Sequence, residues 1–315
     1  ANLTQLNNNL AKEPTASSSF LATVASALTT EAGKTNFTQL HKGLAQEPSA
    51  AASYLGVQAS GVKTDEGKAA FTRIHQQLSQ DSQAAAAYMG TEASGLTTPT
   101  GRQHFTAMHQ EVARNADASA AYLGTKASGV KTDEGKAAFN RIHQQLSQDS
   151  QAAAAYMGTE ASGLTTPTGR QHFTAMHQEV AKNPDASAAY LGTQASGVKT
   201  DEGRQHFIAA QRARAQDPLA SAAYLGTQRT ALQTPEGREA FHQFQRELAR
   251  NPQASSAYFE AQKSALQTPE GRETFAQFQK ELAKDPKASS AYLEAQKSAL
   301  QTPEGRETFA QFQKE

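Results

Sequence analysis

The sequence predicts an all-α fold, an α-solenoid superhelix built from two-helix (helix-turn-helix) repeats of 34 residues. Three observations on recurring residues predict this fold. All eight tyrosines lie 34 residues apart, and so do nine of the fourteen phenylalanines. Gly33 and Thr30 begin two further columns, which recur without exception as far as Gly305 and Thr302. A period of this size is typical of solenoids, in which stacked repeats bury the apolar faces that one repeat cannot bury alone.

The composition agrees with a core that extends lengthwise. Hydrophobic residues make up 37% of the 315 residues and aromatic residues 7%, which is too little large apolar mass for one deep globular core. The chain contains no cysteine, so thiolate metal sites, disulfides and a cysteine nucleophile are excluded. The formal net charge is zero, which removes bulk attraction to nucleic acids or acidic membranes. No apolar run approaches the ~20 residues needed to span a bilayer.

The first helix of each unit is predicted by its start signals, as residues 234–267 illustrate. Thr234 is a preferred N-cap residue, and Pro235 occupies the first helical position. Phe241, Phe244 and Leu248 then recur at i, i+3 and i+7, which places one apolar stripe along a helix. We therefore expect a helix from this threonine to the Asn-Pro pair that comes after the leucine.

The second helix begins with the same kind of signal. Asn251 precedes a proline, and Tyr258, Ala261 and Ala265 lie further along on one face. Aspartate or asparagine occupies this cap in seven of the eight complete units, and Glu47 is the exception. The alanine-rich faces predict helices that pack closely, with one phenylalanine and one tyrosine per unit as anchors.

Two glycine columns inside the second helix need an explanation, because glycine costs about 1 kcal/mol relative to alanine there. One column, from Gly56 to Gly226, becomes Glu260 and Glu294 in the last units, and we expect it to be exposed to solvent. The other column begins at Gly61 and changes only to alanine. We expect a neighbouring helix to lie against that second column.

Residues 1–315 are interpreted as one tandem-repeat solenoid, an excerpt of a longer array. Residues 61–113 and 129–181 differ at one position, Thr72 against Asn140, which indicates duplication of a two-unit block. The complete units are 30–63, 64–97, 98–131, 132–165, 166–199, 200–233, 234–267 and 268–301, with partial units 1–29 and 302–315.

The repeat resembles two known families. Its 34-residue period and its helix-pair architecture are similar to those of tetratricopeptide repeats, but glycine follows tyrosine by two residues, as in Tyr88-Met89-Gly90, and the motif of that family is not matched. The stretch from Gly67 to Ile74 resembles part of the DNA-reading repeat of TAL effectors, Gly-Lys-Gln-Ala-Leu-x-x-Val. That resemblance implies contact between its lysine, here Lys68, and a DNA phosphate.

The strongest candidate for a binding site is the basic column that follows the invariant glycine. A cation near a helix N-terminus opposes the helix dipole, at a cost of about 0.3–1 kcal/mol, so something must offset it in every unit. One interpretation is a structural ion pair with an acidic residue of an adjacent helix, such as Asp65, Glu66 or Glu247, and this is the one we favour. The other is a ladder, one rung per ~10 Å layer, that binds an extended polyanion. The column contains Lys34, Lys68, Arg102, Lys136, Arg170, Arg204, Arg238, Arg272 and Arg306.

A second polar column consists of histidines that become glutamines in the later units, Gln211, Gln245 and Gln279. Glutamine keeps the capacity to hydrogen bond but is a poor metal ligand, so we expect semi-exposed polar neighbours of the core rather than a metal site. Another face of the first helix carries His104, His172 and His206. The main column is His41, His75, His109, His143 and His177.

The unit from Thr200 departs from the pattern, with Ala210 and Arg214 in place of larger apolar residues. We interpret it as a junction between the histidine-type and glutamine-type halves. We find no catalytic constellation in the sequence, and no cofactor or metal is expected.

The sequence therefore predicts a non-catalytic scaffold, spacer or protein-binding surface within a larger bacterial protein, with secretion or surface exposure favoured. The alternative is binding of DNA or another polyanion along the basic column.

Overall fold

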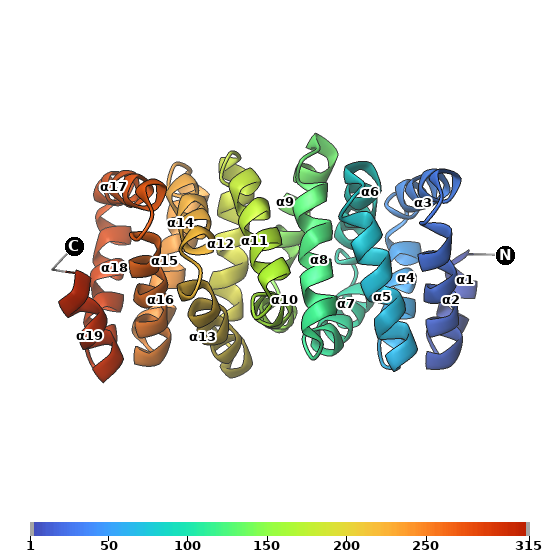
Figure 1. The fold of residues 1–315 in the computed structure, drawn as a ribbon, viewed down its shortest axis with the longest axis horizontal. Helices are drawn as coiled ribbons and strands as arrows, with labels where there is room; N and C mark the ends of the chain where they lie inside the picture. The colour runs from blue at the N-terminus through green and yellow to red at the C-terminus, as the bar shows by residue number, and fades with distance from the viewer. Residues whose placement is uncertain (1–2, 313–315) are drawn as a thin grey trace. The chain divides into compact units, whose positions relative to one another are not determined.

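Helices joined by short turns make up residues 3–312, the part of the chain that the computed structural model describes, and no strand occurs among them. We call the odd-numbered helices "helices A" and the even-numbered ones "helices B", after the first and second helix of the repeat (Figure 1). Helices A are α1 (Leu3–Leu10), α3 (Glu31–Leu44), α5 (Asp65–Leu78), α7 (Pro99–Val112), α9 (Asp133–Leu146), α11 (Pro167–Val180), α13 (Asp201–Ala215), α15 (Pro235–Ala249), α17 (Pro269–Ala283) and α19 (Pro303–Phe312). Helices B are α2 (Pro14–Ala27), α4 (Pro48–Gly61), α6 (Ser82–Gly95), α8 (Ala116–Gly129), α10 (Ser150–Gly163), α12 (Pro184–Gly197), α14 (Pro218–Ala231), α16 (Pro252–Ala265) and α18 (Pro286–Ala299). The all-α solenoid of helical repeats is confirmed.

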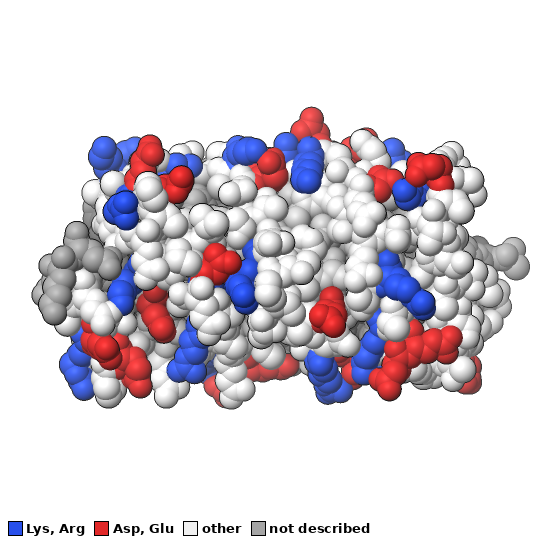
Figure 2. Space-filling model, viewed as in Figure 1, with Lys and Arg blue, Asp and Glu red and all other residues white. Residues whose placement is uncertain are grey.

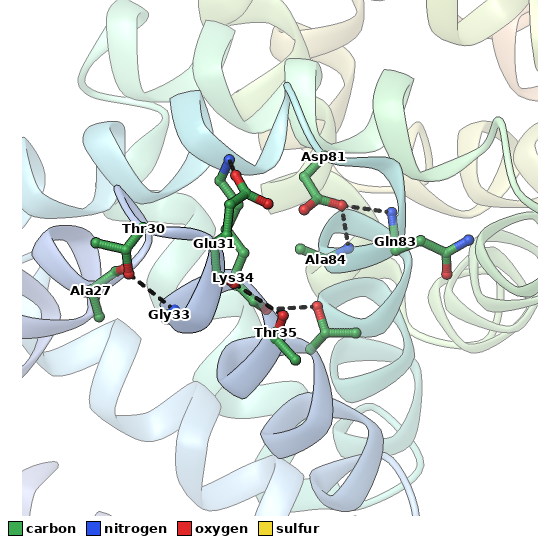
Figure 3. Close-up of polar contacts among 10 residues, drawn as sticks. Ala27, Thr30, Glu31, Gly33, Lys34, Thr35, Asp81, Gln83 and Ala84 are labelled. Atoms are coloured by element: carbon green, nitrogen blue, oxygen red, sulfur yellow. Dashed lines mark hydrogen bonds and ion pairs between the residues drawn. The ribbon is translucent and has the colours of Figure 1, made fainter.

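The predicted caps start the helices. The Oγ1 of Thr30 accepts the backbone N–H of Gly33 at 3.0 Å, and Thr234 does the same for Gly237 (Figure 3). At the start of α6, the carboxylate of Asp81 accepts two backbone N–H groups. Glu47 makes no such bond, and Glu13, which precedes α2 in the first partial repeat, makes none either.

The invariant glycine that follows each threonine cap lies against the end of the previous helix B. A Cβ atom at Gly67 would collide with the backbone carbonyl of Gly61, and one at Gly33 would collide with that of Ala27. The turn between helix B and helix A is therefore tight enough to exclude every side chain at this position.

The described residues form two compact units. One contains residues 3–145 and 158–172, and the other contains residues 146–157 and 173–312. Each unit has its own set of helix–helix contacts.

Within each unit, a helix packs mainly against the helix three places further along the chain. In the first unit, α1, α4 and α7 form one row, α2, α5 and α8 a second, and α3 with α6 a third. In the second unit the rows are α12–α15–α18, α13–α16–α19 and α14–α17. Helices that are consecutive in the sequence make far less contact. One turn of the solenoid therefore contains three helices, although one repeat contains only two.

Helices B form the interior. Each contacts the next helix B, as α4 does with α6 and α14 with α16, and in α4 every residue from Ala50 to Gly61 is buried. Helices A bury one stripe and expose the opposite face, as α5 does. The small residues of helices B allow this close packing, as their sequence predicts.

The two glycine columns of helix B differ from each other in their environment. A Cβ atom at Gly95 would lie 3.3 Å from the backbone of Ala51, in the neighbouring helix B, so the predicted close approach is confirmed. Exposure of the other column is wrong for Gly158, which is buried. It is also wrong for Gly56 and Gly124, which are buried as well.

Histidines of a later helix A cover these buried glycines. The ring of His104 lies over Gly56, and the ring of His172 lies over Gly124. The Nδ1 atoms of the two rings lie 3.0 and 2.9 Å from backbone carbonyls of the same helix B. The prediction holds at Glu260, which is exposed.

Candidate functional site

The arginines of the basic column contact the end of the preceding helix B. In each case Nη1 donates to the backbone carbonyl six residues earlier, over 2.8–3.1 Å, as Arg238 does to Leu232. The other members with this bond are Arg102, Arg170, Arg204, Arg272 and Arg306. The guanidinium thus satisfies one of the carbonyls that a helix C-terminus leaves without a partner.

The lysines of the column contact acids in the first turn of their own helix. Lys34 donates to Glu31 at 2.8 Å (Figure 3). Lys68 and Lys136 lie 3.9 and 3.5 Å from Asp65 and Asp133. The hydrogen bond with Glu31, the largest cause, raises the pKa of Lys34 above its ordinary value.

This geometry explains why a basic residue lies in the first turn of the helices A from α3 to α19. The basic head lies beside the negative end of the preceding helix, or beside an acid, and either contact offsets the unfavourable dipole of its own helix. Arg238 makes both kinds of contact, because its Nε also lies 3.5 Å from the carboxylate of Asp285, which caps α18. The contacts differ from the ion pair with an adjacent helix that the sequence suggests: the lysines pair within their own helix, the arginines donate to backbone carbonyls, and Arg238 has an acid of another helix nearby.

The arrangement of the column differs from the ladder of the alternative interpretation, with one rung per layer. Arg204, Arg238 and Arg272 belong to α13, α15 and α17, which lie in three different rows of the second unit. Arg306 in α19 returns to the row of α13. Successive basic residues are therefore distributed around the solenoid, and only every third one lies in the same row.

The histidine column is fully buried, so its predicted partial exposure is wrong. His41, His75, His109, His143 and His177 are all 0% exposed. The Nδ1 of His75 lies 2.8 Å from Thr125 Oγ1 of α8, fifty residues later. Its ring lies edge-on to Tyr88, with the centroids 5.0 Å apart.

The same arrangement recurs along the column. His41, His109 and His177 pair with Thr91, Thr159 and Thr227, each with 2.8 Å between Nδ1 and Oγ1. Burial lowers the pKa of His41 to about 3. His206 lies outside this set, in α13, with its Nε2 3.6 Å from Glu202.

A polar column of helix B, absent from the sequence predictions, runs through the interior. We call it the polar spine: Gln58, Glu92, Lys126, Glu160, Gln194, Gln228 and Gln262, each at most 4% exposed. In the second unit, Tyr258 donates to Gln228, Gln262 donates to Tyr258, and Tyr292 donates to Gln262, over 2.7–3.0 Å. The recurrence of a polar residue four positions after every tyrosine is the signal in the sequence that could reveal the spine.

The spine contains a buried ion pair in the first unit. Lys126 Nζ lies 2.5 Å from Glu92 Oε2, and both side chains are 0% exposed. Tyr122 also donates to this carboxylate, at 3.0 Å. Burial, the largest cause, lowers the pKa of Lys126, and Glu92 acts in the opposite direction.

Arg214 is a second buried cation, in the second unit. It is 0% exposed, and its guanidinium carbon lies 4.1 Å from the ring centroid of Tyr224 and 5.1 Å from that of Phe173. Nε donates to the carbonyl of Ala210, but neither Nη1 nor Nη2 has a hydrogen-bond partner within residues 3–312. The 34-residue repeat that begins at Thr200, predicted to be a junction, therefore contains a buried charge where other repeats have leucine or valine.

Two grooves lie between a helix A and the helix B of the following repeat, on corresponding pairs of helices. One, of about 460 Å³, lies between α5 and α8 and is lined by Asp65, Lys68, Ala69, Thr72, Arg73, Asn115 and Asp117. The other, of about 440 Å³, lies between α15 and α18 and is lined by His242, Arg246, Pro286, Lys287, Ser290, Ala291 and Glu294. The helices of the two grooves correspond, and two lining positions are shared, Thr72 with His242 and Asp117 with Lys287; the other lining residues come from different positions along the helices.

Neither a metal site nor a membrane span is found in the part of the chain that the structure describes. No three histidine or acidic side chains there come together as a metal ion would require. None of the described helices is both long and apolar enough to cross a bilayer. Lys, Arg, Asp and Glu are interspersed on the face shown in Figure 2, without a broad patch of one sign.

No protein-family model matches this sequence, and no curated protein matches it significantly.

Proposed function

We propose that this chain is a non-catalytic repeat scaffold that binds other proteins through the grooves between helices A and B. The observation that carries this proposal is a groove of similar volume on two corresponding pairs of helices, in which Thr72 and Asp117 of one groove are replaced by His242 and Lys287 of the other. A constant backbone with variable surface side chains is how solenoid proteins build extended binding surfaces. The same proposal includes protein binding in the manner of tetratricopeptide repeats and a place for the chain within a bacterial protein that is exported.

The interior chemistry supports a scaffold. The buried histidines, the polar spine and the Lys126–Glu92 pair all join one helix to another. Polar groups that are satisfied in this way specify which helices pack together.

Binding of a polyanion along the basic column receives less support. The arginines already donate to backbone carbonyls, and successive ones lie in different rows. If a polyanion nevertheless binds there, affinity for DNA or heparin should fall steeply with salt, and Arg204→Ala, Arg238→Ala and Arg272→Ala should weaken it. If the column is structural, the same variants should lower the melting temperature and change no binding.

The groove proposal can be tested with charge reversals. Arg73 and Asp117 are exposed and line the first groove. We expect R73E with D117K to abolish crosslinking to a partner that the unaltered chain captures. Lys63 is exposed in the turn before α5, outside the lining, so K63E is the control.

The binding partner should be retained by the control and lost by the groove variant while both proteins keep their helicity. A partner retained by both, or lost by both, contradicts binding through this groove.

A further inference from the structure

The buried histidines have a chemistry that the proposed scaffold role does not use. Around His75, the ring centroids of Phe71, Tyr88 and Tyr122 lie 4.1, 5.0 and 5.3 Å away. His41 is enclosed in the same way by Phe37, Tyr54 and Tyr88. Each imidazole thus lies where a helix A meets two successive helices B.

A second proton on the imidazole finds no acceptor at Nε2. The hydroxyl of Thr125 has one proton and two acceptors within reach, the backbone carbonyl of His75 at 3.2 Å and Nδ1 at 2.8 Å. Whichever nitrogen carries the proton of the neutral ring, the charged ring carries a proton on both nitrogens. The Nε2 atoms of His41 and His75 are buried without a hydrogen-bond partner within residues 3–312.

The surroundings of His75 do not compensate such a proton. The charged and titratable groups that act on this ring or pack on it are Lys126, His41, Tyr88 and Tyr122. Lys126 repels a second positive charge, and Glu92 is already engaged by Lys126 and Tyr122. His109 faces the same lysine, as well as His75, and His143 faces Lys126.

The chain carries its own control for this arrangement. Fifty residues after each histidine of the column stands a threonine, whereas the residue fifty positions after Gln211 or Gln245 is alanine, Ala261 or Ala295. Both glutamines are 0% exposed. Both members of the histidine-threonine pair are thus replaced together, by a glutamine and an alanine, neither of which takes up a proton.

We propose that the histidine-threonine pairs form an acid-sensitive lock, so that helices α3, α5 and α7 separate from their neighbours in mild acid while α15–α18 stay packed.

The direction in which stability changes with pH follows from proton linkage. The unfolded chain binds a proton at the ordinary histidine pKa of about 6.5, whereas the fold lowers the pKa of His41 to about 3 and those of His75 and His109 well below the ordinary value. The contribution of these histidines to stability is therefore complete above about pH 6.5 and is lost as the pH falls from there toward about 3. Each such histidine raises the ratio of open to closed protein about tenfold per pH unit in this range.

Hydrogen exchange measured by mass spectrometry on the full chain between about pH 7.5 and 4.5 tests the lock, after correction for the intrinsic pH dependence of exchange. We expect peptides from α3, α5 and α7 to lose protection as the pH falls, with a slope of about two to three protons. Peptides from α15–α18 should lose little protection over the same range.

Two exchanged pairs sharpen the test. H75Q with T125A installs the glutamine-alanine pair and should reduce the slope in α5 by about one proton. Q245H with A295T installs the lock between α15 and α18 and should make those helices acid-sensitive. The second variant keeps the proposal testable if the first does not fold.

The lock is disproved if the α3–α7 peptides stay protected down to about pH 4.5. It is equally disproved if Q245H with A295T leaves the pH dependence of α15 and α18 unchanged in a folded protein.

Discussion

The buried polar side chains distinguish one repeat from the next. At one position of helix B, the chain places glutamine, glutamate or lysine without changing the packing around it. A buried ion pair is weak evidence for stability, because the desolvation of both charges opposes their attraction, whereas loss of one partner leaves the other uncompensated. The charges of this column therefore define which helices B are neighbours.

The Lys126–Glu92 pair gives a prediction at this scale. Either E92Q or K126Q should lower the free energy of unfolding by about 3–5 kcal/mol, since one buried charge loses its partner. The double variant should recover most of that loss, because it reproduces the glutamine found at Gln228 and Gln262. Urea denaturation of the four proteins checks the cycle, and additive losses in the double variant would contradict it.

Arg214 gives the opposite prediction. Its guanidinium is buried with two nitrogens that have no hydrogen-bond partner within the described residues, and stacking on two rings offsets only part of that cost. We expect R214L, which introduces the residue type found at Leu248 one unit later, to raise the free energy of unfolding by about 1–4 kcal/mol. L248R is the matched reverse substitution and should destabilise. Thermal unfolding measures both, and a lower melting temperature for R214L would show that the guanidinium has a partner.

At the scale of the helices, local signals define the boundaries. Caps and periodic apolar residues act within a few residues of each other, so Thr234 and Asn251 predict the starts of α15 and α16 correctly. Partners along the third-neighbour rows cannot be predicted in this way, because they depend on how helices stack. A signal is present nonetheless, in the joint change of His and Thr to Gln and Ala at a separation of fifty residues.

The burial of the histidines shows the same limit. Taken alone, the change from His to Gln indicates partial exposure, since both side chains are polar. The interior instead supplies a threonine hydroxyl and aromatic rings, which accommodate a neutral imidazole. Only the packed neighbours, and not the column itself, reveal this environment.

The glycine after each threonine cap gives a prediction about the turn. G67A should cost about 1–3 kcal/mol, because the new methyl group collides with a backbone carbonyl that can move little. Gly43 lies in α3, where an added methyl group would meet no other atom within 4 Å, so G43A is the control. It should be neutral or stabilise by up to about 1 kcal/mol. Chemical denaturation compares the two, and equal effects would contradict the packing explanation.

At the scale of the whole molecule, we consider deletion of one 34-residue repeat. Because one turn contains three helices, the stability of the shortened protein depends on which interior residues the deletion brings together. Deletion of residues 234–267 brings Gln211 opposite Ala295 and leaves every pair of the same type. Deletion of residues 98–131 instead places Glu160 where Lys126 meets Glu92, so two buried carboxylates face each other. The first protein should keep its helicity per residue and unfold cooperatively, while the second should be markedly less stable.

Circular dichroism and thermal melts at about pH 7.5 compare these deletions, since the buried histidines are neutral there in both proteins. Equal melting temperatures for the two would mean that the polar spine does not discriminate between neighbouring helices.

The mismatch between a two-helix repeat and a three-helix turn has a further consequence. Within one compact unit, each added repeat advances the chain by two of the three rows, so successive repeats present their grooves from different rows. A helix A returns to the same row only after three repeats, as α19 does relative to α13. Gain or loss of one or two repeats inside such a compact unit therefore changes the row in which every later groove of that compact unit lies.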